Sequence, residues 1–158
     1  MKTVILCGGL GSRLSEKTKN KPKPMVSVGN LPILCHIMNI YKKYGFNDFI
    51  LATGYKSEYI KRYFNYKNIK KFGFKIKIVY TGQKTMTGGR ILRLKNFFKP
   101  NENFMLTYGD GLTDQNLKML IRSHLKAKKF ATVTAVRPPI RFGELSLKGR
   151  NVINFREK

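Results

Sequence analysis

The stretch Val4–Met25 reads VILCGGLGSRLSEKTKNKPKPM, and the rest of the chain is best interpreted from it. The apolar run Val4–Cys7 predicts a short buried strand. Gly8, Gly9 and Gly11 follow at once, and so many glycines let the main chain approach another group closely. A strand, a glycine-rich turn and then a helix is the general arrangement for cradling a phosphate. The stretch therefore predicts a nucleotide or phosphate site directly after the first strand.

Cations in the same stretch indicate an anionic ligand. Arg13 stands in the turn, and a planar guanidinium matches phosphate oxygens bidentately. Pro22 and Pro24 stiffen the segment around Lys23, because each fixes its own φ and biases the preceding residue towards extended geometry. The GxxxxGK[ST] pattern of a P-loop is absent, and the turn lacks the third glycine of a dinucleotide fingerprint. A mobile hinge loop is the alternative that the glycines alone leave open.

Strand-like and helix-like segments alternate along the chain. The first strand is expected over 2–7. Further strands are predicted over 48–53, 75–80, 103–108, 130–136 and 151–157, and helices over 31–44, 56–64, 87–98 and 113–128. Gly45 is expected to end the first helix and Thr113 to begin the last. This alternation is typical of an α/β fold with a mainly parallel sheet, whose ligands lie at the carboxyl ends of the strands. We expect a single domain over residues 1–158.

Composition limits the class of protein. The 158 residues suffice for one domain, and 42% of them are hydrophobic. No apolar run reaches the ~20 residues of a membrane span, and the N-terminus lacks the longer apolar region of a secretory signal. We therefore expect a cytoplasmic protein without a membrane partner. Cys7 and Cys35 lack metal-site spacing and are expected to be small buried hydrophobes, while His36 and His124 lack a paired ligand.

The motifs resemble those of a known enzyme family. GGLGSRL at 8–14 and KPKPM at 21–25 resemble the signature of the sugar-1-phosphate nucleotidyltransferases. MTGGR at 86–90 and TYGDG at 107–111 resemble the glucose-1-phosphate cytidylyltransferase branch, and FREK at 155–158 is similar to its F-x-E-K element. The resemblance implies a Rossmann-like nucleotidyltransferase domain, a mainly parallel mixed sheet with flanking helices. It also implies Mg²⁺-dependent formation of CDP-glucose and pyrophosphate from CTP and glucose 1-phosphate, in lipopolysaccharide O-antigen biosynthesis, by a homo-oligomer.

Such a reaction needs positioning and charge neutralisation more than acid–base catalysis, because the attacking sugar phosphate is already an anion. The resemblance implies that Arg13 neutralises the triphosphate and that Lys23 reaches the α-phosphate. It implies that Asp110 binds Mg²⁺. Asp110 also follows a predicted strand, where an α/β sheet presents its ligands, and Mg²⁺ typically takes one or two carboxylates. A turn-forming aspartate is the alternative.

The resemblance also implies two sets of binding residues. The nucleotide-binding set is Leu6, Cys7, Gly8, Gly9, Leu10, Gly11, Ser12, Arg13, Lys23, Thr85, Gly89, Arg90 and Asp110, and the sugar-phosphate set is Gly143, Glu157 and Lys158. For Glu157 and Lys158 an ordinary frayed terminus is the alternative. Family members are longer, so the C-terminal part of the family's domain is missing here, including its second metal-ligating aspartate. We expect the N-terminal, nucleotide-binding portion; a fragment, half of a split enzyme and a degenerate copy stay open.

A second hypothesis comes from charge. Lysine and arginine number 32 against 8 acidic residues, a net charge of +24. Between residues 61 and 77, cations alternate with aromatic residues and no acid occurs, which suits single-stranded nucleic acid. One alternative is therefore an inactive fragment that acts as a nucleotide- or nucleic-acid-binding module. Another is a sugar-1-phosphate nucleotidyltransferase with a different base or sugar. For this segment we favour a solvated helix face and an edge strand protected by lysines. AT-rich coding explains the high net charge equally well as a functional role does.

Overall fold

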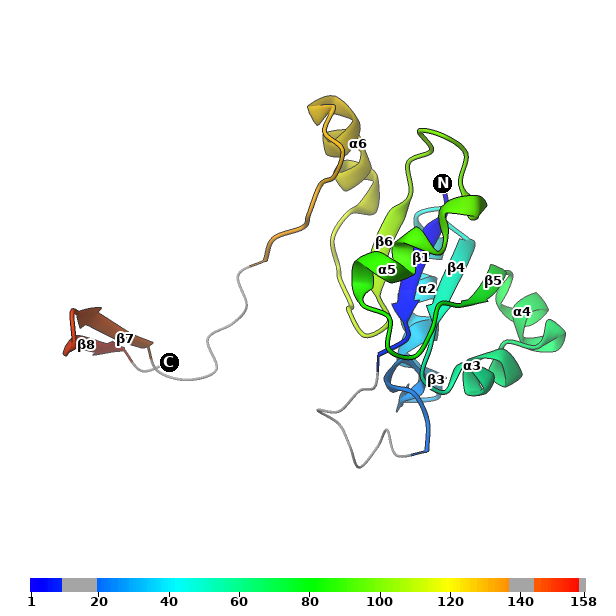
Figure 1. Ribbon diagram of the computed structural model, residues 1–158, viewed down its shortest axis with the longest axis horizontal. Helices are drawn as coiled ribbons and strands as arrows, with labels where there is room; N and C mark the ends of the chain where they lie inside the picture. The colour runs from blue at the N-terminus through cyan, green and yellow to red at the C-terminus, as the bar shows by residue number, and fades with distance from the viewer. Residues whose placement is uncertain (10–19, 137–143, 157–158) are drawn as a thin grey trace. The chain divides into compact units, whose positions relative to one another are not determined.

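The computed structural model in Figure 1 describes residues 1–9, 20–136 and 144–156. These residues belong to two compact units, Met1–Leu120 and Ile121–Lys158. The expectation of one domain over the whole chain stays a prediction. None of the helices in the described ranges is both long and apolar enough to cross a membrane.

A four-stranded parallel sheet forms the centre of the first unit. Its strands are β1 (Thr3–Cys7), β4 (Asp48–Thr53), β5 (Lys75–Tyr80) and β6 (Met105–Tyr108), in the order β5-β4-β1-β6. The chain first builds outwards from β1 to β4 and β5, and then returns to place β6 on the other side of β1. The predicted α/β fold with a mainly parallel sheet is therefore confirmed. The order reverses between β1 and β6, which is where sheets of this class bind ligands.

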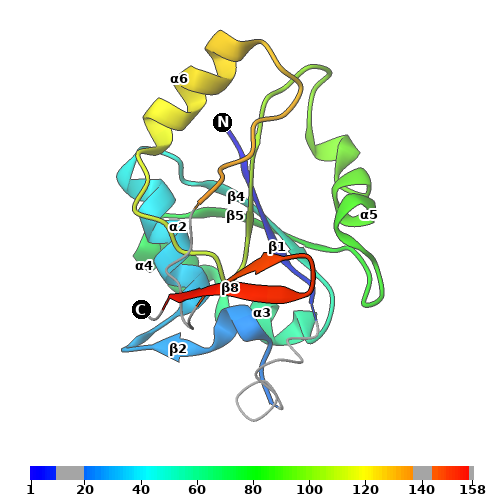
Figure 2. The same cartoon turned by 90° about the vertical axis from the view of Figure 1, so that its left-hand side faces the viewer.

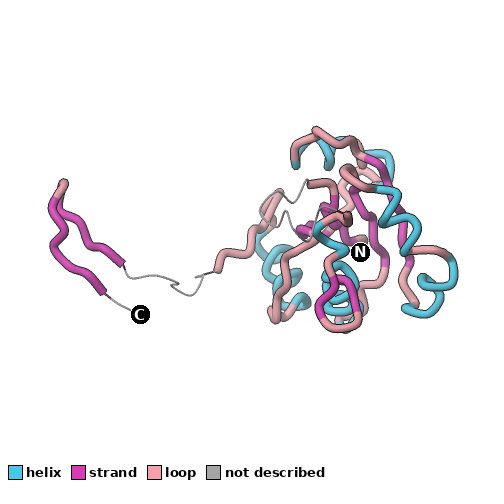
Figure 3. The backbone as a smooth tube through the Cα atoms, turned by 90° about the horizontal axis from the view of Figure 1, so that it is seen from below, coloured by secondary structure: helices cyan, strands magenta, loops and turns pink. Residues whose placement is uncertain are grey.

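Helices cover both faces of this sheet. Figures 1 and 2 show α2 (Ile33–Lys43) on one face and α5 (Thr87–Leu92) on the other, and Figure 3 shows helices around the strands from below. The α5 face buries a cluster of Val4, Leu6, Ile50, Ala52 and Leu94. Residues that alternate with these, such as Ile5 and Leu51, are also fully buried, so β1 and β4 are covered on both sides. This burial explains why both strands read as continuous apolar runs.

Several helix limits differ from the prediction. The helix expected from residue 31 begins at Ile33, because β3 (Leu31–Pro32) pairs with β2 (Ser27–Val28) in a short hairpin. It ends at Lys43 with Tyr44 as the C-cap, one position before the predicted cap; Gly45 follows with φ of 90° and donates its N–H to the Lys42 carbonyl at 2.8 Å. The helix expected over 56–64 is α3 (Ser57–Tyr63), and the one expected over 87–98 is divided into α5 and the 3₁₀ turn η3 (Lys95–Phe97).

The basic segment contains a helix that was not predicted, α4 (Tyr66–Phe72). The Asn65 side chain caps it by accepting the N–H of Asn68 at 3.0 Å. Gly73 ends it in the left-handed conformation, with φ of 64°. An Asn at the start and a Gly at the end were the sequence signals for this helix.

The start of α6 (Leu117–Ala127) corrects the prediction that Thr113 begins this helix. Asn116 accepts the N–H groups of Lys118 and Met119 at 3.1 and 3.2 Å, which is the cap geometry. Thr113 instead accepts the N–H of Gln115 within the preceding turn. Of the two residues that could cap this helix, Asn116 rather than Thr113 sets its first residue.

The strand expected over 130–136 is wrong. These residues form no strand, and the side chains of Phe130, Val133 and Val136 are exposed. A β-branched run becomes a strand only when its N–H and carbonyl groups find a partner strand. In the second unit the described strands pair with each other instead, as the antiparallel hairpin of β7 (Glu144–Lys148), which was not predicted, and β8 (Asn151–Arg156), which was.

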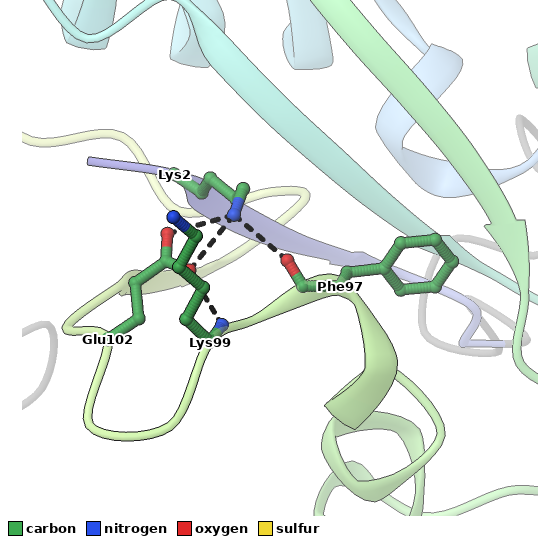
Figure 4. Close-up of polar contacts among 4 residues, drawn as sticks. All are labelled: Lys2, Phe97, Lys99 and Glu102. Carbon is green, nitrogen blue, oxygen red and sulfur yellow. Dashed lines mark hydrogen bonds and ion pairs between the residues drawn. The ribbon is translucent and has the colours of Figure 1, made fainter.

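A set of polar contacts, here called the polar clasp, connects Lys2, Phe97, Lys99 and Glu102 at the amino end of the sheet (Figure 4). Lys2 Nζ donates to both carboxylate oxygens of Glu102, at 2.8 and 3.1 Å, and to the Phe97 carbonyl at 2.9 Å. Glu102 also accepts the Lys99 N–H at 2.9 Å. The hydrogen bond from Lys2, and to a smaller extent the one from the Lys99 N–H, hold the pKa of Glu102 below its ordinary value. The clasp joins the start of β1 to the loop that leads into β6.

Candidate functional site

A cavity of about 370 Å³ opens at the carboxyl ends of β1 and β6, where the strand order reverses. Four segments line it: the turn after β1, the segment of Lys23, the start of α5 and the end of β6. Of the predicted nucleotide-binding residues, its lining includes Leu6, Cys7, Gly8, Gly9, Lys23, Thr85, Arg90 and Asp110. Gly89, in α5, is not among the lining residues, so its role stays a prediction. Leu10, Gly11, Ser12, Arg13, Gly143, Glu157 and Lys158 lie outside the described residues, so their roles stay predictions.

Lys23 is presented by a short turn that the prolines shape. Pro22 has φ −68° and ψ 148°, so its own φ is fixed as predicted. The segment does not stay extended, however, because Lys23–Met25 forms the 3₁₀ turn η2, closed by the Met25 N–H donated to the Pro22 carbonyl at 2.8 Å. Pro24 and Met25 are buried and anchor the turn, so the lysine starts from a fixed main chain.

Asp110 is brought next to this turn by the glycine before it. The Gly109 N–H donates to the Leu6 carbonyl at 3.0 Å, which continues the pairing of β6 with β1. A Cβ at Gly109 would lie 2.7 Å from Pro24 Cγ, closer than side chains tolerate. Glycine is therefore required here for η2 and the end of β6 to pack against each other.

As a result, Lys23 and Asp110 form an ion pair although 87 positions separate them. Lys23 Nζ lies 2.5 Å from Asp110 Oδ2, and the two side chains are 29% and 35% exposed. The sequence predicted a cation and a metal ligand at the site, but not that each neutralises the other. The pair can open towards a ligand that offers phosphate oxygens to the ammonium and a cation to the carboxylate.

The cavity fits Mg²⁺ only in company with a phosphate ligand. Asp110 is the carboxylate on its lining, and no group of three potential metal ligands occurs within the described residues. Burial raises the pKa of the Cys7 thiol, and the charge of Asp110 raises it further, so the thiol is protonated at neutral pH. Mg²⁺ commonly takes one or two carboxylates and completes its shell with phosphate oxygens and water.

Arg90 lies at the cavity, but its side chain is only 5% exposed. Its guanidinium donates to the carbonyls of Gly8 at 2.9 Å and Gly82 at 2.7 Å, and to the Thr81 hydroxyl at 2.8 Å. These acceptors were not foreseen from the sequence. A signal for them existed, because a Thr-Gly pair stands at the end of two neighbouring strands: at 53–54, where Thr53 is the last residue of β4, and at 81–82, directly after β5. Direct contact of Arg90 with a nucleotide stays a prediction.

The aromatic residues of the basic segment are mostly committed to packing. Phe64 and Phe74 are each 4% exposed. Phe74 packs edge-on against Phe49, with ring centroids 5.5 Å apart, and stacks on Phe72 at 5.4 Å. Tyr66, by contrast, is 79% exposed. Rings buried in this way are not available to stack on bases, which favours the packing interpretation of this segment.

Comparisons with known proteins agree with the geometry. A family model described as nucleotidyl transferase matches residues 2–158. The chain is 42% identical to the glucose-1-phosphate cytidylyltransferase of Salmonella typhimurium and 43% identical to the probable glucose-1-phosphate cytidylyltransferase of Bacillus subtilis, in both cases over 100% of this chain and 69% of the relative. Among solved structures, a putative glucose-1-phosphate thymidylyltransferase from Bacillus anthracis superposes with a TM-score of 0.73 at 24% identity, over 99% of this chain and 64% of that one, which shows a shared fold. The chain thus spans about two thirds of the length of these proteins.

Proposed function

Because this chain belongs to the nucleotidyl transferase family, we propose that its cavity binds CTP for Mg²⁺-dependent transfer of the nucleotidyl group to glucose 1-phosphate. The observation that carries the proposal is the Lys23–Asp110 pair, which lies in a cavity at the strand-order reversal, beside the Gly8–Gly9 turn. An ammonium and a carboxylate that lie side by side suit a ligand that brings both phosphates and a metal ion. The choice of CTP and glucose rests on the similarity to the cytidylyltransferases.

In this proposal the sugar phosphate oxygen attacks the α-phosphorus, a new P–O bond forms, and pyrophosphate leaves with the electrons of the broken bond. No group has to accept a proton, since the nucleophile is an anion already. Lys23 donates to the α-phosphate and stabilises the charge that develops there. Asp110 would hold Mg²⁺, which supplies neutralisation of the charge between the phosphates. The Gly8–Gly9 turn offers main-chain groups that can lie close to the nucleotide, because a Cβ at Gly9 would meet no atom of the described residues within 4 Å.

The remaining predicted roles belong to the same proposal. Arg13 would neutralise the leaving pyrophosphate, and Glu157 and Lys158 would meet the sugar hydroxyls and the sugar phosphate. The product, a nucleotide sugar, would enter O-antigen biosynthesis in the cytoplasm, where nucleoside triphosphates are available. A homo-oligomer is the expected assembly. A related enzyme with another base is the second candidate, because a D-glycero-alpha-D-manno-heptose 1-phosphate guanylyltransferase of Aneurinibacillus thermoaerophilus is 34% identical over 100% of this chain.

Pyrophosphate release by the purified chain tests this function. We expect release with Mg²⁺, glucose 1-phosphate and CTP to exceed release with UTP, dTTP, ATP or GTP. Asp110→Asn and Lys23→Met should each lower the rate by roughly 10²–10³-fold, the usual effect of losing one group that stabilises transition-state charge. Asp48→Asn is the matched control, because Asp48 lies at the amino end of β4, away from the cavity.

Two results would count against the proposal. Release that persists in Asp110→Asn would remove the carboxylate from the reaction. Absence of release with every nucleotide, from a wild-type chain shown to be folded by circular dichroism, would exclude catalysis by this chain alone. A preference for dTTP or UTP would retain nucleotidyl transfer and change the base.

A further inference from the structure

Two arginines lie one turn apart at the end of α5, Arg90 within the helix and Arg93 as its C-cap residue, and both donate hydrogen bonds to residues at the ends of the strands. Arg90 Nη1 donates to the Thr53 carbonyl at 3.2 Å and to the Gly82 carbonyl at 2.7 Å, while Nη2 donates to the Gly8 carbonyl at 2.9 Å. The three carbonyls follow or end β4, β5 and β1 respectively. One guanidinium thus links three neighbouring strands at the edge where the cavity opens.

Arg93 makes the corresponding link to the loop that follows β5. Its Nη1 donates to the Thr81 carbonyl at 2.5 Å and to the Thr85 hydroxyl at 2.8 Å. Thr85 lines the cavity, whereas Arg93 is not among its lining residues. Because the Thr85 oxygen already accepts from a guanidinium, its own proton is available for a hydrogen bond to a ligand.

Glycines at the three strand ends provide the space for these two side chains. A Cβ at Gly8 would overlap the Arg90 guanidinium, and a Cβ at Gly54 would lie 2.8 Å from its Nη1. Gly82 has φ of 94°, and a Cβ there would collide with both Arg93 and Thr85. The absence of side chains at these positions is therefore matched to the two arginines.

Both Nη groups of Arg90 donate to oxygens of the protein. Nη1 serves Thr53, Thr81 and Gly82, and Nη2 serves Gly8 and, at 3.4 Å, the Gln83 carbonyl. None of the salt bridges of the described residues includes Arg90, so a buried cation is held by carbonyl and hydroxyl oxygens. A phosphate could bind either Nη group only by breaking these bonds, each of which is costly to lose next to a buried charge.

We propose that Arg90 and Arg93 are positioning residues: Arg90 holds the Gly8 main chain, and Arg93 holds the Thr85 hydroxyl, in the geometry that receives the nucleotide. The proposal rests on the proposed function and adds that Arg90 acts through Gly8 without touching a phosphate. Its charge contributes to the positive field at the cavity, but its hydrogen bonds determine the shape.

Hydrogen exchange of the ligand-free chain tests the structural part without any nucleotide. In Arg90→Lys we expect the amides around Gly8–Gly9 and Gly82–Thr85 to exchange about 10-fold faster or more, since a lysine keeps the charge but cannot reach three strand ends with a planar fork. In Arg93→Lys the increase should be confined to the residues around Thr85. Arg62→Lys is the control, because Arg62 is exposed on α3. Unchanged exchange in a folded Arg90→Lys would overturn the proposal.

Affinities for cytidine, CMP and CTP test how Arg90 acts. A positioning residue predicts the same loss, about 10-fold, for all three ligands, as expected when hydrogen bonds to a charged group are lost. A loss that appears only with added phosphates would identify Arg90 as a phosphate ligand and overturn the proposal. Should Arg90→Lys fail to fold, Arg93→Lys with Thr85→Val decides: the double variant should bind CTP no more weakly than Thr85→Val alone. Additive losses would show that Arg93 acts elsewhere.

The two proposals fail in different ways. If the wild-type chain binds none of these ligands, the proposed function is wrong, while hydrogen exchange still decides whether Arg90 and Arg93 organise the strand ends. If nucleotides bind and exchange is unchanged in the variants, the function stands and the positioning roles are wrong.

Discussion

The Lys23–Asp110 ion pair affects how a metal ion and a nucleotide bind in the cavity, separately or together. Lys23 Nζ lies 2.5 Å from Asp110 Oδ2, so a metal ion reaches this oxygen only by displacing Lys23, and at either oxygen it meets the repulsion of the nearby ammonium. A triphosphate removes this conflict, because its oxygens accept the ammonium and supply further metal ligands. Metal and nucleotide should therefore bind with positive coupling, each raising the affinity for the other by the same factor.

Mn²⁺ binding followed by electron paramagnetic resonance measures this coupling. Without nucleotide, we expect Lys23→Met to bind Mn²⁺ roughly two- to fivefold more tightly than the wild type, the range that a partly exposed ion pair supports. Adding CTP should tighten Mn²⁺ binding more in the wild type than in Lys23→Met. Asp110→Asn should remove the site in both backgrounds. Equal Mn²⁺ affinity of wild type and Lys23→Met would show that the pair does not guard the carboxylate.

At the scale of elements, the approach of η2 to the end of β6 assembles the pair. The contact depends on Gly109, where a Cβ would lie 2.7 Å from Pro24 Cγ and 3.1 Å from the Leu6 carbonyl. Two residues further on, a Cβ at Gly111 would meet nothing closer than 3.8 Å, which is ordinary contact. Neither glycine has the positive φ that would itself require glycine. A difference in stability between alanine substitutions at Gly109 and Gly111 would therefore report side-chain crowding and not backbone strain.

We predict that Gly109→Ala lowers the free energy of unfolding by about 1–3 kcal/mol, the usual cost of overpacking. It should also weaken Mn²⁺ binding in the presence of CTP, because η2 and β6 have to separate. Gly111→Ala should change stability by less than about 0.5 kcal/mol, as is usual away from such features. Urea unfolding of the two variants and the wild type makes the comparison. Equal stability of Gly109→Ala and Gly111→Ala would mean that the contact between Pro24 and the β6 end adjusts freely.

For the whole molecule, the net charge of +24 predicts binding to any polyanion. Because the aromatic residues of 61–77 are largely packed, we expect binding to single-stranded RNA to fall steeply with salt and to show no base preference. Reversing Lys70 and Lys71, exposed on α4, should weaken binding no more than reversing the exposed Lys43 and Lys118. Fluorescence anisotropy with poly(A) and poly(C) measures both effects. A selective loss with Lys70 and Lys71, or a preference for one base, would instead identify a nucleic-acid site.

The sequence by itself determined the features that depend on near neighbours in the chain. The limits of β4 and β5 were predicted correctly, since an apolar or alternating run records which residues are buried. The residues of the glycine turn, Lys23 and Asp110 were identified as site candidates from their motifs. The strand expected over 130–136 failed for the complementary reason, because its composition says nothing of whether a partner strand lies beside it.

Only the tertiary structure decided which candidates meet and what they do to one another. The reversal of strand order at β1 places Lys23 against Asp110, and the ends of β1, β4 and β5 converge on Arg90. The contacts of Arg93 also became visible only in the structure, where it donates to Thr81 and Thr85, twelve and eight residues before it. Periodicity and turn chemistry act over a few residues, whereas these contacts depend on strand order and register, which are set by the packing of the whole sheet.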